Sequence, residues 1–277
     1  MTNLLRNQLT GFLNTPPLWI NSEILNLQQF NFPKIQFPDN SEIEENLPGL
    51  ATNFVLGKRM EKYFSLGLKR SRKYRVLAEN IQIIKDKITL GEIDFILEDL
   101  QTGKTIHVEL VYKFYVYDPS IKNEMERWIG PNRKDSLLQK LIKIKDSQFP
   151  FLFNSQTKRV LEKLNIYSEN IEQLVCFKAQ LFIPKRIHKE NFYSLNQKCI
   201  SGYWITFSEF DTTEYFNFLF FAPKKQNWPV QPEYQDIWFS FDEIKLQILK
   251  LFTEKKSPLI WMKINSQKIE KFFVVWW

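Results

Sequence analysis

Two stretches of the chain alternate regularly between apolar and polar side chains. In residues 92–98 apolar side chains alternate with mostly acidic ones, and in residues 105–117 an unbroken apolar series alternates with a mostly polar one. Because successive side chains of a strand point to opposite faces of a sheet, this pattern predicts two strands, each with one apolar face. The linker 99–104 contains Gly103, which adopts a positive φ without strain, so the two strands are expected to form a hairpin.

The hairpin register follows from the same pattern. If Asp99 faces Lys104, the apolar faces of the two strands coincide and Asp94 lies across from Glu109; a shift of one residue would set apolar against polar side chains, so only this register or one shifted by two fits. Two facing carboxylates repel at a Cβ separation of roughly 5 Å. A Mg²⁺ ion would relieve that repulsion, and Lys113 shares the face. An ordinary solvated acidic face is the alternative, but charges in the middle of a central strand suggest a cleft.

The remaining pattern predicts an α/β chain. Helical spacing of Leu56, Met60 and Tyr63 predicts a helix over 53–68 that Asn53 is able to cap. Apolar runs predict further strands over 76–84, 174–183, 203–207, 215–221, 259–264 and 272–277. One helix is expected over 132–147, with Arg133 and Lys134 in its first turn. Another is expected to start at Ser240, which forms a capping box with Glu243. Residues 1–50 read as helical pieces broken by prolines, without recognisable chemistry.

Charge adds a preference for polyanions. The chain carries a net charge of +7, and residues 58–75 hold eight basic residues against one acid, Glu61. A second basic group follows the hairpin, at Arg133, Lys134, Lys140, Lys143 and Lys145. Basic patches on either side of an acidic strand pair suit a nucleic acid and a metal ion, although lysine runs also occur as plain solvated helix faces.

Cysteine and histidine usage excludes several classes of site. Cys176 and Cys199 lack the spacing of a zinc site, and with only His107 and His188 a histidine-rich metal centre is excluded. The N-terminus does not read as a signal peptide, and no apolar run reaches the length of a membrane span. We therefore expect a cytoplasmic protein that makes no contact with a membrane.

Several longer motifs resemble a known bacterial family. They are TPPLW at 15–19, LGKRMEKYF at 56–64, AENIQI at 78–83, LGEIDFIL at 90–97, HVELVYKFYV at 107–116 and WIGPNRKDSLLQKL at 128–141. Together they resemble the family called domain of unknown function 1853, which carries no established activity. The resemblance covers most of residues 15–150 and extends more weakly to residues 202–204.

The predicted order α-β-β-β-α-β also resembles the core of the PD-(D/E)xK nuclease superfamily, in which three acids and a lysine surround one or two Mg²⁺ ions. By that resemblance Glu61 matches the helix acid, Asp94 the aspartate, and Glu109 with Lys113 the last motif. The spacing departs from the family pattern, since Glu109 and Lys113 are four residues apart instead of two. Their Cα atoms would lie about 13 Å apart along the strand.

These observations give one leading hypothesis. We expect a single nuclease-like domain over 1–277, with a PD-(D/E)xK-like core at about 50–185 and a C-terminal α/β extension at about 186–277. Asp94, Glu109 and Glu61 would bind Mg²⁺ or Mn²⁺, Lys113 would neutralise phosphoryl charge, and His107 would support Glu109, replace the base or serve a structural role. The side chains expected to contact nucleic acid are Arg70, Arg72, Lys73, Asn132, Arg133, Lys134 and Lys140.

Two other hypotheses stay open. One is a catalytically inactive descendant of the same fold that binds nucleic acid or a protein partner. The other is a structural or interaction protein that uses a sheet edge near residues 272–277. The sequence gives no indication of the oligomeric state, the substrate or the cleavage mode.

Overall fold

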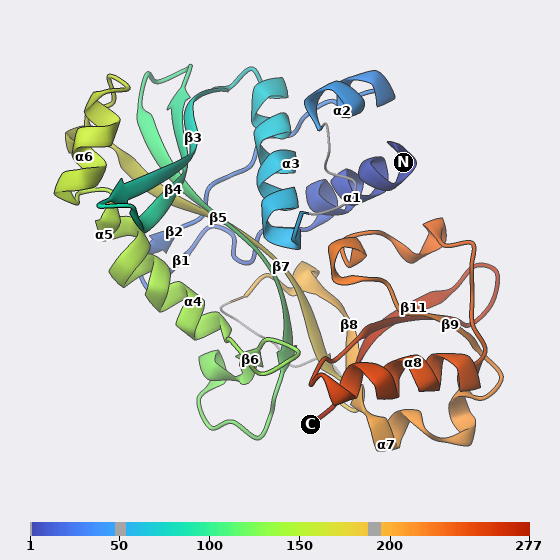
Figure 1. The fold of residues 1–277 in the computed structure, drawn as a ribbon. Coiled ribbons are helices and arrows are strands. Elements are labelled where there is room, and N and C mark those ends of the chain that lie inside the picture. The colour runs from blue at the N-terminus through green and yellow to red at the C-terminus, as the bar shows by residue number, and fades with distance from the viewer. Residues whose placement is uncertain (1, 48–53, 188–194) are drawn as a thin grey trace.

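A computed structural model describes residues 2–47, 54–187 and 195–277. Within these residues one nine-stranded mixed sheet runs through the molecule, and a separate two-stranded ribbon lies in the N-terminal segment. Helices cover the sheet, so the prediction of an α/β fold is confirmed (Figure 1). Across the described residues, no helix combines the length and apolarity needed to cross a membrane.

The sheet divides into an N-terminal and a C-terminal half. Its main path, in spatial order, is β3 (Tyr74–Lys85), β4 (Ile88–Asp99), β5 (Thr105–Tyr117), β7 (Glu172–Pro184), β8 (Ile200–Thr206), β11 (Ile269–Val275), β10 (Leu259–Lys263) and β9 (Leu219–Phe221). The short β6 (Trp128–Ile129) pairs with the end of β5. β5 and β7 are parallel neighbours, which requires the long helical crossover between them.

Helices lie on both faces of the N-terminal half (Figure 1). One face carries α1 (Thr2–Asn14), α2 (Asn40–Asn46) and α3 (Leu56–Arg70), and the other carries α4 (Leu137–Lys143), a π-helical turn (Ile144–Gln148), α5 (Phe149–Phe151) and α6 (Ser155–Glu162). The apolar stripe of α3 is buried as predicted, with Met60 and Tyr63 inaccessible to solvent. The helix starts at Leu56, and the capping prediction for Asn53 lies outside the described residues.

The second helix of the core differs from the prediction. α4 begins at Leu137, where Ser136 and Gln139 form a capping box, instead of near residue 132. Arg133 therefore lies in a preceding turn with φ of 56°, and Lys134 lies outside the helix too. The prediction that both residues occupy the first helical turn is wrong, because the side-chain cap at Ser136 fixes the start at Leu137, beyond both residues.

The C-terminal half packs around its own apolar cluster under α7 (Phe207–Phe210) and α8 (Phe241–Thr253). The predicted capping box of Ser240 and Glu243 is confirmed. β11 lies between β8 and β10, and Phe272 and Phe273 are fully buried. The hypothesis of a binding edge at residues 272–277 is therefore wrong for the strand itself, since both edges of β11 are paired.

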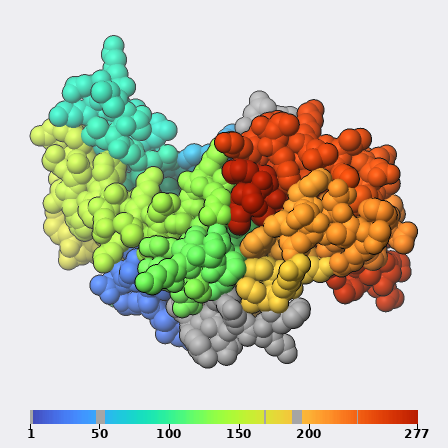
Figure 2. All heavy atoms as spheres, turned by 90° about the horizontal axis from the view of Figure 1, so that it is seen from below, coloured from blue at the N-terminus to red at the C-terminus, as the bar shows by residue number. Residues whose placement is uncertain are grey.

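The turn after β6 joins the two halves. Asn132 Oδ1 accepts a hydrogen bond from the Ser257 backbone N–H at 2.8 Å, and Arg133 lies over the Trp277 ring at 4.3 Å. Figure 2 shows the dark red C-terminal residues against the green segment that contains this turn. The predicted strand over 215–221 is confirmed only for Leu219–Phe221; residues 213–215 form a 3₁₀ turn instead.

Candidate active site

The predicted acids meet where β4 and β5 separate. The pairs Phe95–Val108 and Leu97–Ile106 confirm the predicted register, and Gly103 has a φ of 70° in the turn. The ladder ends at Phe95, one residue before Asp94 would pair. There Asp94 Oδ2 accepts a hydrogen bond from the Leu110 backbone N–H at 2.9 Å, so its side chain replaces the missing strand partner.

Glu109 lies beneath the crossover helices. Its side chain is 1% exposed, accepts a hydrogen bond from Gln148 Nε2 and lies 3.1 Å from His107 Nε2. Gln173 Nε2 contacts His107 Nδ1 at 3.0 Å. Because the amide donates to Nδ1, the proton of a neutral imidazole lies on Nε2 and points at Glu109. His107 thus supports Glu109 directly. The open cleft expected from the sequence is absent at these two residues, because the π-helical turn and α5 cover them.

Burial and like charge act together on Asp94. Loss of hydration, followed by repulsion from Glu109 and more weakly from Glu61, raises the pKa of Asp94 to about 8, although the Leu110 N–H opposes the shift. A half-buried and a fully buried carboxylate that repel each other give the electrostatic environment that a cation would stabilise.

Lys140 of α4 is the cation that approaches these acids. Its Nζ donates to Gln148 Oε1 at 2.7 Å, and the same amide donates to Glu109. Burial lowers the pKa of Lys140, while attraction from Glu109 and Asp94 opposes that effect. From the sequence, Lys140 was expected among the residues that steer a nucleic acid backbone. Its position beside the acids was missed, because only the crossover geometry brings α4 over β5.

Glu61 lies close enough to influence Asp94 but is held elsewhere. Its carboxylate is 2.9 Å from Lys58 Nζ, and the same ammonium contacts Glu92 at 2.8 Å. Burial raises the pKa of Glu61 and Lys58 counteracts it. The carboxylate is therefore satisfied by an ion pair on the flank of α3.

Lys113 is held by a different carboxylate from the two hairpin acids. Its Nζ is 2.6 Å from Asp135 Oδ2, and it lines a cavity further along β5. The structure thus brings together Asp94, Glu109, His107 and Lys140, and it does not place Lys113 with them.

Most of the other predicted contact residues have structural partners. Arg70 pairs with Glu42, Lys73 lies 3.9 Å from Asp99, and Arg133 pairs with Asp118 at 3.0 Å. Arg72 and Lys134 are exposed. Arg70, Arg72 and Lys73 lie at the C-terminal end of α3, more than two helical turns beyond Glu61, so this patch is remote from the acids.

The acids fit a metal ion only in part. Within the described segments, no group of three or more His, Cys, Asp or Glu side chains is arranged to hold a metal ion. Asp94 and Glu109 alone match the one or two carboxylates that Mg²⁺ takes together with waters and phosphate oxygens. To use both Glu109 oxygens, an ion would have to displace the Gln148 amide.

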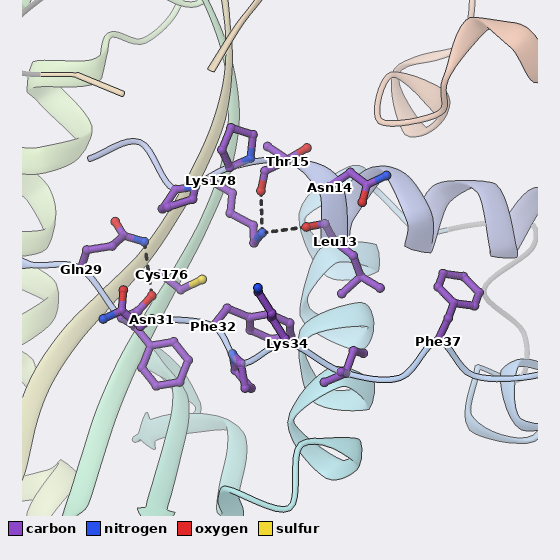
Figure 3. A pocket seen from close by; sticks show the side chains of 15 residues that line it. Leu13, Asn14, Thr15, Gln29, Asn31, Phe32, Lys34, Phe37, Cys176 and Lys178 are labelled. Atoms are coloured by element: carbon purple, nitrogen blue, oxygen red, sulfur yellow. Dashed lines mark hydrogen bonds between the residues drawn. The ribbon is translucent and has the colours of Figure 1, made fainter. Parts of the chain in front are cut away.

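A second cavity lies on the opposite side of the sheet, between the N-terminal segment and β7 (Figure 3). It encloses about 490 Å³, and Lys178 is its buried charge. Lys178 Nζ donates to the Thr15 carbonyl at 2.6 Å and the Leu13 carbonyl at 3.4 Å, and lies near the Phe12 and Phe32 rings. These contacts satisfy the C-terminal end of α1, so Lys178 has a structural role.

A family model described as "Domain of unknown function (DUF1853)" matches residues 8–275. That match confirms the first resemblance over nearly the whole chain. No curated protein and no solved structure matches this chain.

Proposed function

We propose that this chain, which belongs to the DUF1853 family, is a metal-dependent phosphodiesterase of PD-(D/E)xK type that acts on nucleic acid. The single observation that carries the proposal is the fork between β4 and β5, where Asp94 accepts the backbone N–H next to Glu109 and the Gln148 amide links Glu109 to Lys140. The elements α3, β3, β4, β5, α4 and β7 follow the chain order expected for such a core.

Each residue has a role that follows from its contacts. Asp94 and Glu109 would hold a divalent ion, and His107 and Gln148 keep the Glu109 carboxylate oriented. Lys140, which reaches the same amide from the other side, would place positive charge next to a phosphate. The chemistry that Mg²⁺ or Mn²⁺ supplies when bound is polarisation of a phosphate oxygen and a lower pKa of the attacking water.

Lys140 is thereby proposed for the role that the sequence assigned to Lys113. A lysine on a helix that crosses the strand face can reach the acids from above, whereas Lys113 starts about 13 Å from Glu109 along β5. The four-residue spacing between Glu109 and Lys113 is then compatible with the proposal, because Lys113 lines the neighbouring cavity instead.

A cleavage assay tests the proposal. The wild-type protein is expected to cut single-stranded or duplex DNA or RNA with Mg²⁺ or Mn²⁺ and to be inactive in EDTA. Glu109→Gln and Lys140→Met should each lower the rate about 100-fold or more, the range seen when a preorganised charge is removed. The matched controls are Glu254→Gln and Lys250→Met. They change exposed residues at the end of α8, away from the fork between β4 and β5.

One observation favours a second candidate, an inactive nuclease-like protein that binds nucleic acid or a protein partner. Glu109 is covered by Gln148, and Glu61 is occupied by Lys58. In that case no metal ion would support cleavage, and binding would persist in EDTA and weaken with salt.

A further inference from the structure

A cavity of about 560 Å³ lies further along β5, where several segments of the chain meet. It is lined by the start of α3, by residues 112–114 of β5, by the turn after β6, and by Lys225 and Trp228 from the C-terminal half. We call it the lysine cavity, because Lys113, Lys134 and Lys225 line it while Asp135 is its one acidic lining residue among those described.

The charges in the lysine cavity are not balanced. Asp135 pairs with Lys113 at 2.6 Å, which leaves Lys134 and Lys225 without a carboxylate among the described lining residues. Burial and the charge of Lys113 lower the pKa of Lys225, while Asp135 opposes this. An anion in the cavity would offset the repulsion between the ammonium groups of Lys225 and Lys113.

The stretch of β5 that lines the cavity has one edge to which no strand of the described residues is paired. β5 pairs with β7 continuously from Ile106 to Val116, but on its other edge the β4 ladder ends at Val108 and β6 begins at Val116. Leu110 directs its N–H to this edge, where Asp94 accepts it. Because N–H directions alternate along a strand, the N–H groups of residues 112 and 114 point to the same edge.

The walls suit a nucleotide unit rather than a bare anion. Leu56, Phe114 and Trp228 give the cavity an apolar and aromatic lining, and Lys225 Nζ lies over the Trp228 ring at 5.6 Å. The volume matches sites for single small ligands. A positively charged groove beside apolar and aromatic side chains is the usual design for single-stranded nucleic acid.

We infer that the lysine cavity holds one nucleotide unit of a single-stranded nucleic acid, with its phosphate between Lys134, Lys225 and the open edge of β5. The inference deepens the proposed function and rests on it, because the same strand would continue along β5 to the acids. It assigns Lys113 a role in this cavity, where its contact with Asp135 already places it.

Gly57 offers a test that leaves the packing intact. A side chain at Gly57 would meet no atom within 4 Å, and the residue lies in the first turn of α3 and lines the cavity. Gly57→Glu therefore adds a negative charge to the cavity, and acids in the first turn favour a helix. Lys225→Glu is the second variant, and Lys250→Glu on α8 is the matched control with the same change of charge.

Binding is measured by fluorescence anisotropy with labelled single-stranded DNA and RNA of one sequence, in EDTA so that nothing is cleaved. The wild type and Lys250→Glu should bind alike, while Gly57→Glu and Lys225→Glu should each weaken binding by about tenfold at low salt. The salt slope should fall by about 0.7 for each phosphate that a variant no longer neutralises. Thermal melting confirms that the variants fold.

The inference is overturned if the cavity variants bind like the control, if the wild type binds neither probe, or if an acidic peptide displaces the probe and pairs with the strand edge instead. Its failure is separate from that of the proposed function. Undiminished cleavage by Gly57→Glu would refute the role of the lysine cavity and leave the proposed nuclease activity standing. Binding that depends on the cavity, without cleavage under any metal, would refute the nuclease activity and leave the binding site standing.

Discussion

Replacing Asp94 by asparagine should stabilise the protein. Burial and the charge of Glu109 raise the pKa of Asp94 to about 8 from its ordinary value of 3.8. Asparagine has no charge to bury and keeps an oxygen that can accept the Leu110 N–H. The substitution thus removes an unfavourable charge without leaving a buried donor unpaired.

The sign follows from proton linkage. A folded-state pKa above the unfolded value means that the folded protein binds the proton more tightly, so the contribution to stability is complete below about pH 4 and is lost as the pH rises to about 8. A pKa raised from 3.8 to about 8 would correspond to about 6 kcal/mol without any relaxation. Because Asp94 is only half-buried and Lys140 can adjust, we expect about 2 kcal/mol at pH 8 and little difference at pH 4.

Thermal and urea unfolding of both proteins between pH 4 and pH 9 provides the assay. A gain of about 2 kcal/mol corresponds to a rise in Tm of about 5 °C for a chain of this size. Asp118→Asn is the control: Asp118 is buried and pairs with Arg133, so its loss should destabilise. Equal stability of Asp94→Asn and the wild type at every pH would refute the claim that the two carboxylates repel each other in the folded protein.

Three further predictions concern single residues. Lys140→Met should lower kcat for metal-dependent cleavage about 100-fold or more in a steady-state assay, whereas Lys113→Met should mainly raise the KM; the reverse result would return the catalytic role to Lys113. Gln148→Leu removes the donor to Glu109 Oε2, and because His107 contacts only the other oxygen, urea unfolding should show a loss of about 2 kcal/mol that added Mg²⁺ partly restores. Gly202→Ala should lower the free energy of unfolding by about 3 kcal/mol or more in the same assay, since a Cβ there would lie 2.0 Å from the Lys271 carbonyl oxygen. An unfolding curve like that of the wild type would contradict the tight contact between β8 and β11.

The sequence was sufficient for the elements that alternate or repeat strongly. The hairpin register could be predicted because a one-residue slip would have exposed a full apolar face. The structure has the predicted pairs as far as Phe95 and Val108, but the ladder ends before the predicted pair of Asp94 and Glu109. The capping box at Ser240 was equally visible, because it is a local pattern. The start of α4 was misplaced because the prediction followed the apolar pattern and did not use the same capping-box spacing at Ser136 and Gln139.

The composition of the site was harder to predict than the fold. Asp94 and Glu109 lie on paired strands, so their proximity follows from register. Lys140 comes from a helix that follows a long crossover, and no periodicity in the sequence states which strand residue a crossover helix will cover. Gln148 was missed for the same reason, and its position in a π-helical turn directs it toward Glu109.

Calorimetric titration of Mn²⁺ into the wild type, Asp94→Asn and Glu109→Gln tests the central claim most directly, since it asks whether the two hairpin carboxylates form one cation site. We expect saturable binding of Mn²⁺ to the wild type, with release of a proton near pH 7 because Asp94 must ionise, and a loss of binding in both variants. Absence of binding in the wild type, or binding that both variants retain, would contradict the claim.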